Sequence, residues 1–176
     1  MEKTVSIPEG VSVEKKGSLL VVTGPKGSLE RTLSTEKVIL TIEKDAVRIA
    51  SAVERRKVLA MTGTTAAHLK NMIAGVTNGF EAKLKVIYSH FPMKVKSEGD
   101  KVVIQNFLGG RAARSIEILK GVTVDVKKDD ITISGMDREA VGQTAGRIEQ
   151  ITKVKGFDRR VFQDGIHLVQ KTQEIA

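Results

Sequence analysis

Short stretches of alternating apolar and polar residues lead into a longer stretch with helical spacing, and this order occurs twice along the 176 residues. In the first half, the alternation and the short apolar runs are typical of β-strands. These segments are 11–13, 19–22, 29–33, 38–42 and 47–50. The sequence Gly-Pro-Lys-Gly at 24–27 predicts a turn, because glycine accepts positive φ and proline presets φ. Asp45 predicts a tight turn between the last two strands.

A helix is predicted after these strands. Six positions, three to four residues apart, form one mainly apolar stripe, which is the spacing of a helix that buries one face. They are Val58, Thr62, Thr65, Leu69, Met72 and Val76. Asn78 and Gly79 predict the C-terminal end of the helix, since both tolerate the left-handed backbone that follows many helices.

The second half repeats this order. Strand patterns cover 94–96, 101–105, 115–119, 122–126 and 131–134. A helical stripe follows at Val141, Ala145, Ile148 and Ile151. Asp137 is a candidate N-cap, because its side chain can accept a hydrogen bond from a free backbone N–H. Between the halves, residues 81–89 alternate lysine with leucine and valine, and predict an extended connector.

The two halves also match residue by residue, which indicates a duplication. Ile7 and Pro8 recur as Phe91 and Pro92 at an offset of 84. The offset falls to 79 in the helices and to 77 at the glycine–phenylalanine pairs 79–80 and 156–157. The sequence therefore predicts an α+β fold of two tandem, duplicated domains, 1–82 and 83–176. Each is expected to be a small, mainly antiparallel sheet packed on one helix.

Charge points to a polyanionic partner. The net charge is +8 and the pI is near 9.7, a balance that attracts phosphates and nucleic acid. Residues 140–171 hold six bases against three acids, so the C-terminal stretch is the best candidate for phosphate contacts. There is no cysteine, no secretory signal and no run of 18 apolar residues, which predicts a soluble, intracellular protein with no membrane partner.

The sequence contains no recognisable catalytic motif. Glycine-rich nucleotide loops and the G-x-S-x-G elbow are absent, and His68, His90 and His167 stand far apart without H-E-x-x-H spacing. We therefore expect no enzyme, no catalytic residue, no metal site, no cofactor and no small-molecule substrate.

Two stretches are candidate binding segments. In the first, Asn106 to Arg111 with Arg114 beyond it, paired glycines would allow close backbone approach and the arginines could contact phosphate. Alternatively, its apolar residues tuck against their own sheet. In the second, 153–168, Phe157 and Phe162 alternate with four cations, a combination that can bind phosphates and stack on unpaired bases. This tail forms either a hooked arm with a turn at 164–165 or an edge strand of the second sheet.

A third stretch, Arg55, Arg56 and Lys57, is interpreted as a solvated charge run, because cations at the start of a helix oppose its dipole.

The turn at 24–27, the loop at 106–110 and the tail at 158–168, in this order within a duplicated chain, resemble large-subunit ribosomal protein six in its archaeal and eukaryotic form. The tail differs from the bacterial one and favours an archaeal source. The resemblance implies a cytoplasmic protein of the large ribosomal subunit that binds large-subunit rRNA. It implies docking near the sarcin–ricin region, with neighbouring ribosomal proteins at the base of the stalk that receives translational GTPases.

The resemblance also implies which residues meet RNA. Phe157, which matches Phe80 in the repeat, is expected in the core. The expected RNA-binding residues are Lys153, Lys155, Arg159, Arg160, Phe162, His167, Lys171, Asn106, Gly109, Gly110, Arg111 and Arg114. A rival interpretation is a protein-interaction module that pairs its exposed sheet edges with partner strands.

Overall fold

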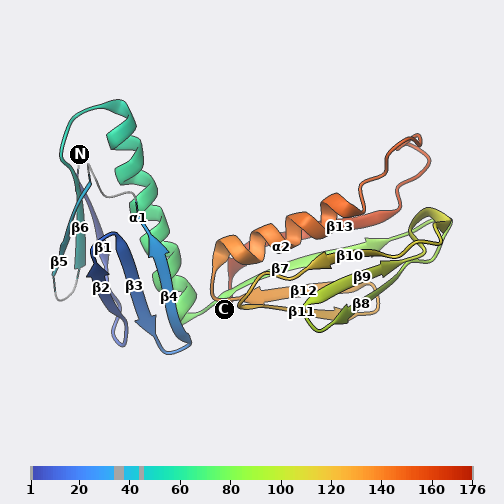
Figure 1. Cartoon of the computed structure of the whole chain (residues 1–176), viewed down its shortest axis with the longest axis horizontal. Coiled ribbons are helices and arrows are strands. Elements are labelled where there is room, and N and C mark those ends of the chain that lie inside the picture. Colours follow the sequence, from blue (N-terminus) through green and yellow to red (C-terminus); the bar gives the residue numbers. More distant parts are fainter. Residues whose placement is uncertain (1, 34–37, 44–45, 176) are drawn as a thin grey trace. The chain divides into compact units, whose positions relative to one another are not determined.

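The computed structural model of the protein describes residues 2–33, 38–43 and 46–175 (Figure 1). The chain divides into two compact units, Met1–Gly79 and Phe80–Ala176. Each unit has antiparallel strands and one long helix, which confirms the predicted α+β fold of two duplicated units. The turn predicted at Asp45 lies outside the described residues.

The first unit contains two three-stranded antiparallel sheets, with strand orders β1-β6-β5 and β2-β3-β4. Its elements are β1 (Glu2–Ser6), β2 (Ser12–Lys16), β3 (Leu19–Gly24), β4 (Gly27–Thr32), β5 (Val38–Ile42), β6 (Ala46–Ser51) and α1 (Arg56–Thr77). Val22, Ile49 and Leu69 come from both sheets and the helix, and all three are fully buried in one core. Gly79 follows α1 with φ of 76°, which confirms the predicted helix end.

The turn predicted at 24–27 is the loop of the β3–β4 hairpin, and it packs on the C-terminal end of α1. The Lys26 backbone N–H donates to the Val76 carbonyl at 3.0 Å, and the Lys26 ammonium donates to the Asn78 carbonyl. A Cβ built on Gly24 would lie 2.6 Å from Cγ2 of Val76. Glycine therefore permits the close approach, and Lys26 supplies donors and charge where helix carbonyls lack partners.

The second unit has a four-stranded sheet, β11-β12-β7-β13, and a three-stranded sheet, β10-β9-β8. Its elements are β7 (Phe80–Ile87), β8 (Lys94–Glu98), β9 (Lys101–Gln105), a 3₁₀ turn (Phe107–Gly109), β10 (Arg114–Glu117), β11 (Val122–Lys127), β12 (Asp130–Gly135), α2 (Arg138–Ile151) and β13 (Gly165–Glu174). The Asp137 carboxylate accepts from the Glu139 N–H at 2.9 Å, so its prediction as the N-cap is confirmed.

Residues 81–89, predicted as an extended connector, belong mainly to a central strand of the second unit. β7 pairs with β12 on one side and with β13 on the other. Alternate residues from Ala82 to Val86 are buried, whereas Lys83 and Lys85 are exposed. This is the period of a half-buried strand. Both partner strands lie far along the chain, so the local pattern could not show that β7 is paired.

Candidate nucleic-acid interface

The second unit gathers most of the chain's aromatic side chains at one end. Of the six aromatic residues, Phe80 lies in the core and is 1% exposed. The other five lie in the connections at 88–93, 106–113 and 152–164. They are Tyr88, Phe91, Phe107, Phe157 and Phe162. These five residues and His90 are called the aromatic end below.

Ring contacts join the three connections. The Phe162 ring lies 5.1 Å from the His90 ring and 5.0 Å from the Phe157 ring, measured between centroids. A Cβ built on Gly109 would lie 3.2 Å from the Phe91 ring, so the 3₁₀ turn contacts the connection between β7 and β8. Segments far apart in sequence therefore meet through aromatic side chains.

The places of Phe157 and Phe162 differ from the expectation. Phe157 was expected in the core but is 52% exposed, whereas Phe162 is half-buried between His90 and Phe157. In the first copy, the residue after the glycine at the helix end enters strand β7 at once. In the second copy the chain continues as a loop until β13 begins at Gly165, so Phe157 stays outside the sheet.

A buried carboxylate ties the tail loop to the connection between β7 and β8. Asp164, which is 1% exposed, accepts hydrogen bonds through Oδ1 from the Ser89 N–H at 2.7 Å and the Ser89 hydroxyl at 2.9 Å. Burial alone would raise the pKa of Asp164. The two hydrogen bonds from Ser89, with smaller contributions from the backbone of Phe91 and from the nearby His90, outweigh burial and lower this pKa below its ordinary value.

The hairpin turn expected at 164–165 is therefore not formed. Asp164 is an internal anchor, and Gly165 begins β13, an edge strand that pairs with β7. Within the described residues, Asp164 Oδ2 is enclosed without a hydrogen-bond partner. Thr152 at the end of α2 accepts from the Ile166 N–H at 3.0 Å, which holds the other end of the loop. Of the two interpretations of the tail, the edge strand holds for 165–174 and the loop for 152–164.

The connection at 106–110 is shaped by its own unit. Phe107 is 4% exposed, as in the alternative in which its apolar residues tuck inward. The Asn106 side-chain amide donates to the Pro92 carbonyl at 3.0 Å. Asn106, Leu108 and Gly109 all have positive φ, between 51° and 72°. The Cβ position of Gly110 lies 3.1 Å from the Phe107 carbonyl, so both glycines fit tightly into the local fold.

The Arg114 side chain makes two contacts within its own unit. Its guanidinium lies 4.3 Å from the centroid of the Phe107 ring, and it donates to the Ile151 carbonyl at the end of α2. Lys26 makes the equivalent contact in the first copy, with the Asn78 carbonyl after α1. In both copies, a cation from the hairpin region satisfies carbonyls at the helix C-terminus.

The remaining candidate cations are exposed, and the tail loop holds most of them. Lys153, Lys155, Arg159 and Arg160 lie within the loop, and Arg111 lies in the connection before β10. Lys153 and Lys155, with Arg114, line a groove with a volume of about 600 Å³. Its other lining residues are Phe107, Leu108, Gln150, Ile151 and Phe157. The groove thus brings together the two candidate binding segments of the sequence.

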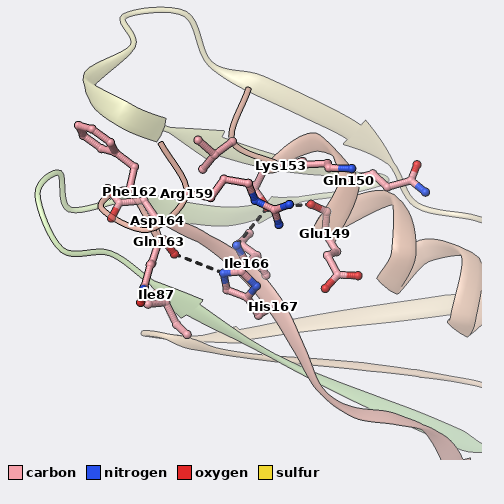
Figure 2. A pocket seen from close by; sticks show the side chains of 12 residues that line it. Ile87, Glu149, Gln150, Lys153, Arg159, Phe162, Gln163, Asp164, Ile166 and His167 are labelled. Carbon is pink, nitrogen blue, oxygen red and sulfur yellow. Dashed lines mark hydrogen bonds between the residues drawn. The ribbon is translucent and has the colours of Figure 1, made fainter. Parts of the chain in front are cut away.

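A second pocket, of about 590 Å³, lies between α2, the tail loop and β13 (Figure 2). Arg159, Glu149 and His167 line it, and Figure 2 shows Phe162 pointing away from them. The His167 Nε2 lies 3.3 Å from the Gln163 carbonyl. Lys171 is exposed on β13, six residues beyond its start, which places it about 20 Å from the loop. Lys171 is therefore separated from the other candidate cations.

A family model for ribosomal protein L6 matches the chain twice, over residues 7–79 and 91–165. The chain belongs to the ribosomal protein L6 family. It is similar to the large ribosomal subunit protein uL6 of Methanothrix thermoacetophila, with 51% identity over 169 residues and 96% of each chain covered. Identity is 47% to the uL6 of Methanosarcina mazei, again with 96% of each chain covered. It is 43% to that of Methanococcus vannielii, with 99% of this chain and 96% of the relative covered.

Family membership confirms the resemblance inferred from the duplication and the three segments. The L6 family is structural and non-enzymatic, as the missing catalytic motifs predict. Relatives of this chain are mostly archaeal, in line with the sequence of the tail. Among the described residues, no helix is both long and apolar enough to cross a membrane.

The connection 88–91 was not among the predicted binding segments, yet it supplies Tyr88, His90 and Phe91 to the aromatic end and Ser89 to the Asp164 anchor. An aromatic cluster directly after a strand was a usable signal, because large rings in a short connection need a packing partner or a ligand. The anchor itself left no signal in the sequence. Its two residues are 75 positions apart.

Proposed function

We propose that this L6-family chain is a structural component of the large ribosomal subunit in the cytoplasm and binds large-subunit rRNA through its second unit. The observation that carries the proposal is one groove in which exposed lysines of the tail loop and Arg114 of β10 lie together with Phe107 and Phe157 of the aromatic end. Lysine and arginine neutralise phosphates, and aromatic rings stack on unpaired bases. The relatives named large ribosomal subunit protein uL6 support the proposal.

In finer detail, we place the bound rRNA near the sarcin–ricin region and the base of the stalk, where the chain and neighbouring ribosomal proteins would support the translation-factor site. The proposed RNA contacts are Lys153, Lys155, Arg159, Arg160, Phe162, His167, Lys171, Asn106, Gly109, Gly110, Arg111 and Arg114. The geometry supports different roles for these residues. Exposed loop cations would meet phosphates directly, whereas Arg114, Gly109 and Gly110 would act mainly by shaping the surface.

Salt dependence tests the proposal. Replacing Arg159 and Arg160 by alanine should lower the slope of log affinity against log salt by about one unit for each lost phosphate contact, measured with a large-subunit rRNA transcript. Lys127 on β11 is also exposed and is paired with Asp125, so Lys127→Ala is the matched control and should leave the slope unchanged. Equal slopes in wild type and the double variant would refute these contacts.

Cell fractionation tests the class of function. The full chain should sediment with the large subunit and lose this association after nuclease treatment. Salt-insensitive retention on a protein, with no RNA present, would instead favour the sheet-edge interaction module.

A further inference from the structure

Three pockets in the described part of the second unit can be compared, and the one between the 3₁₀ turn and the tail loop has the lining best suited to an unpaired nucleotide. Three of its lining residues are cations, and no aspartate or glutamate is among the described residues that line it. The pocket in Figure 2 contains Glu149 and Asp164, and a third pocket contains Asp100 and Glu117. Acidic groups repel phosphate, so these two pockets fit a nucleotide less well.

Phe157 supplies the ring in this groove. Phe162 packs against it at 5.0 Å with an interplanar angle of 54°, and His90 packs behind Phe162 at 5.1 Å. This column supports Phe157 and leaves about half of its surface exposed, at 52%. A ring held in place by its neighbours loses little conformational freedom when a base stacks on it.

Apolar and cationic residues complete the lining of the groove. Phe107 and Leu108 add apolar residues to the same lining as Phe157, and Arg114 is held in place by Phe107 and by the end of α2. Lys153 and Lys155 also line the groove and are exposed. A volume of about 600 Å³ lies within the usual range for small-ligand pockets, roughly 300–1,000 Å³.

We propose that this groove binds one unpaired RNA base, stacked on Phe157, with its phosphate beside Lys153 and Lys155. The inference rests on the proposed function and names a base-stacking residue within it. It also assigns different roles to neighbouring residues, since Phe157 contributes stacking and the two lysines contribute phosphate neutralisation.

The first test measures the affinity of the full-length chain for a large-subunit rRNA transcript. Phe157→Ala should weaken binding about 5- to 150-fold, the usual loss for one stacked base, without changing the salt slope. Phe157→Tyr should stay close to wild type, whereas Phe157→Leu should behave like Phe157→Ala, because leucine is apolar but cannot stack. Val161, an exposed apolar residue of the same loop outside the groove lining, provides the matched control Val161→Ala.

The second test uses a single-stranded ribonucleotide pentamer with 2-aminopurine at its centre, whose fluorescence falls when the base stacks. Wild type and Phe157→Tyr should quench it, and Phe157→Ala should not. Equal quenching by Phe157→Ala, or equal rRNA affinity for Phe157→Leu and Phe157→Tyr, would overturn the base-stacking site. Failure of wild type to bind the rRNA transcript would instead refute the proposed function, and the pentamer would still judge the groove separately.

Discussion

The contact between Gly24 and Val76 allows a sharp test of how the first unit is assembled. A methyl group on Gly24 would lie 2.6 Å from Cγ2 and 2.9 Å from Cβ of Val76, and 3.1 Å from its carbonyl oxygen. Val76 is fully buried on α1, and its carbonyl accepts from the Lys26 N–H at 3.0 Å. In Gly24→Ala, either the hairpin must move off the helix or the buried valine must shift.

The cost follows from this geometry. Forcing an extra carbon into a packed site costs about 1–3 kcal/mol. If the hairpin moves outward, the hydrogen bond from Lys26 to Val76 lengthens, at a cost of about 1 kcal/mol. Gly24→Ala should therefore destabilise the first unit by about 2–4 kcal/mol.

Urea unfolding and hydrogen-exchange mass spectrometry would measure this effect, the latter on peptides from α1. The control is Gly63→Ala, the same chemical change inside α1, where the nearest atom to the new Cβ is the flexible Lys3 ammonium at 3.6 Å. It should stabilise the unit by about 0.5–1 kcal/mol, because alanine is the better helix former.

A double-mutant cycle would attribute the effect to this contact. In a Val76→Ala background the closest contact, with Cγ2 at 2.6 Å, is removed, so Gly24→Ala should cost at least about 1 kcal/mol less than in wild type. The contacts with Cβ at 2.9 Å and with the backbone carbonyl at 3.1 Å would remain, so the relief should be incomplete. An equal cost in both backgrounds, or a neutral Gly24→Ala, would refute the reasoning.

Two more predictions concern the second unit. Asp164→Ala should destabilise it by about 2–4 kcal/mol, because the Ser89 amide and hydroxyl lose a charged acceptor. Burial alone would raise the pKa of Asp164, but hydrogen bonds from Ser89 outweigh burial and lower this pKa. The stabilisation that the ionised carboxylate gives to the folded unit is therefore present above about pH 4 and is lost as pH falls through the lower folded-state pKa. Below about pH 6, the free energy of unfolding measured in urea should depend less steeply on pH for the variant than for wild type. An equal pH dependence of this free energy in both proteins would contradict the prediction. Arg114→Met should cost about 1–2 kcal/mol in urea unfolding through the lost contacts with the Ile151 carbonyl and the Phe107 ring, and an unchanged midpoint would count against them.

Elements with a strong local signal were predictable from the sequence. The two helices, the turn at 24–27, the cap at Asp137 and the helix end at Gly79 follow from residue type and spacing alone. The duplication added a check, because the strand and helix order predicted for one copy had to fit the other. Propensity, capping and periodicity act over a few residues, which is why they could be recognised without the structure.

Features set by distant partners were not predictable. β7 has a strand pattern, but its place in the centre of a sheet depends on β12 and β13. Phe157 matches Phe80 in the repeat, yet only the route of the loop toward β13 shows that its ring remains exposed. The Asp164 anchor pairs residues 75 positions apart. In each case a contact across the chain decided the environment of the side chain.

One cation in each copy contacts the protein itself, which reduces the number of cations available to RNA. Lys26 and Arg114 both meet carbonyls at the end of a helix, so one cation of each copy serves the fold. In the second copy, the longer connection adds Phe107 beneath Arg114, and Phe107 and Leu108 line the groove. A net charge of +8 therefore overstates the cations available to phosphate. RNA affinity should depend on the exposed loop at 152–164, where the lysines and arginines lie beside Phe157.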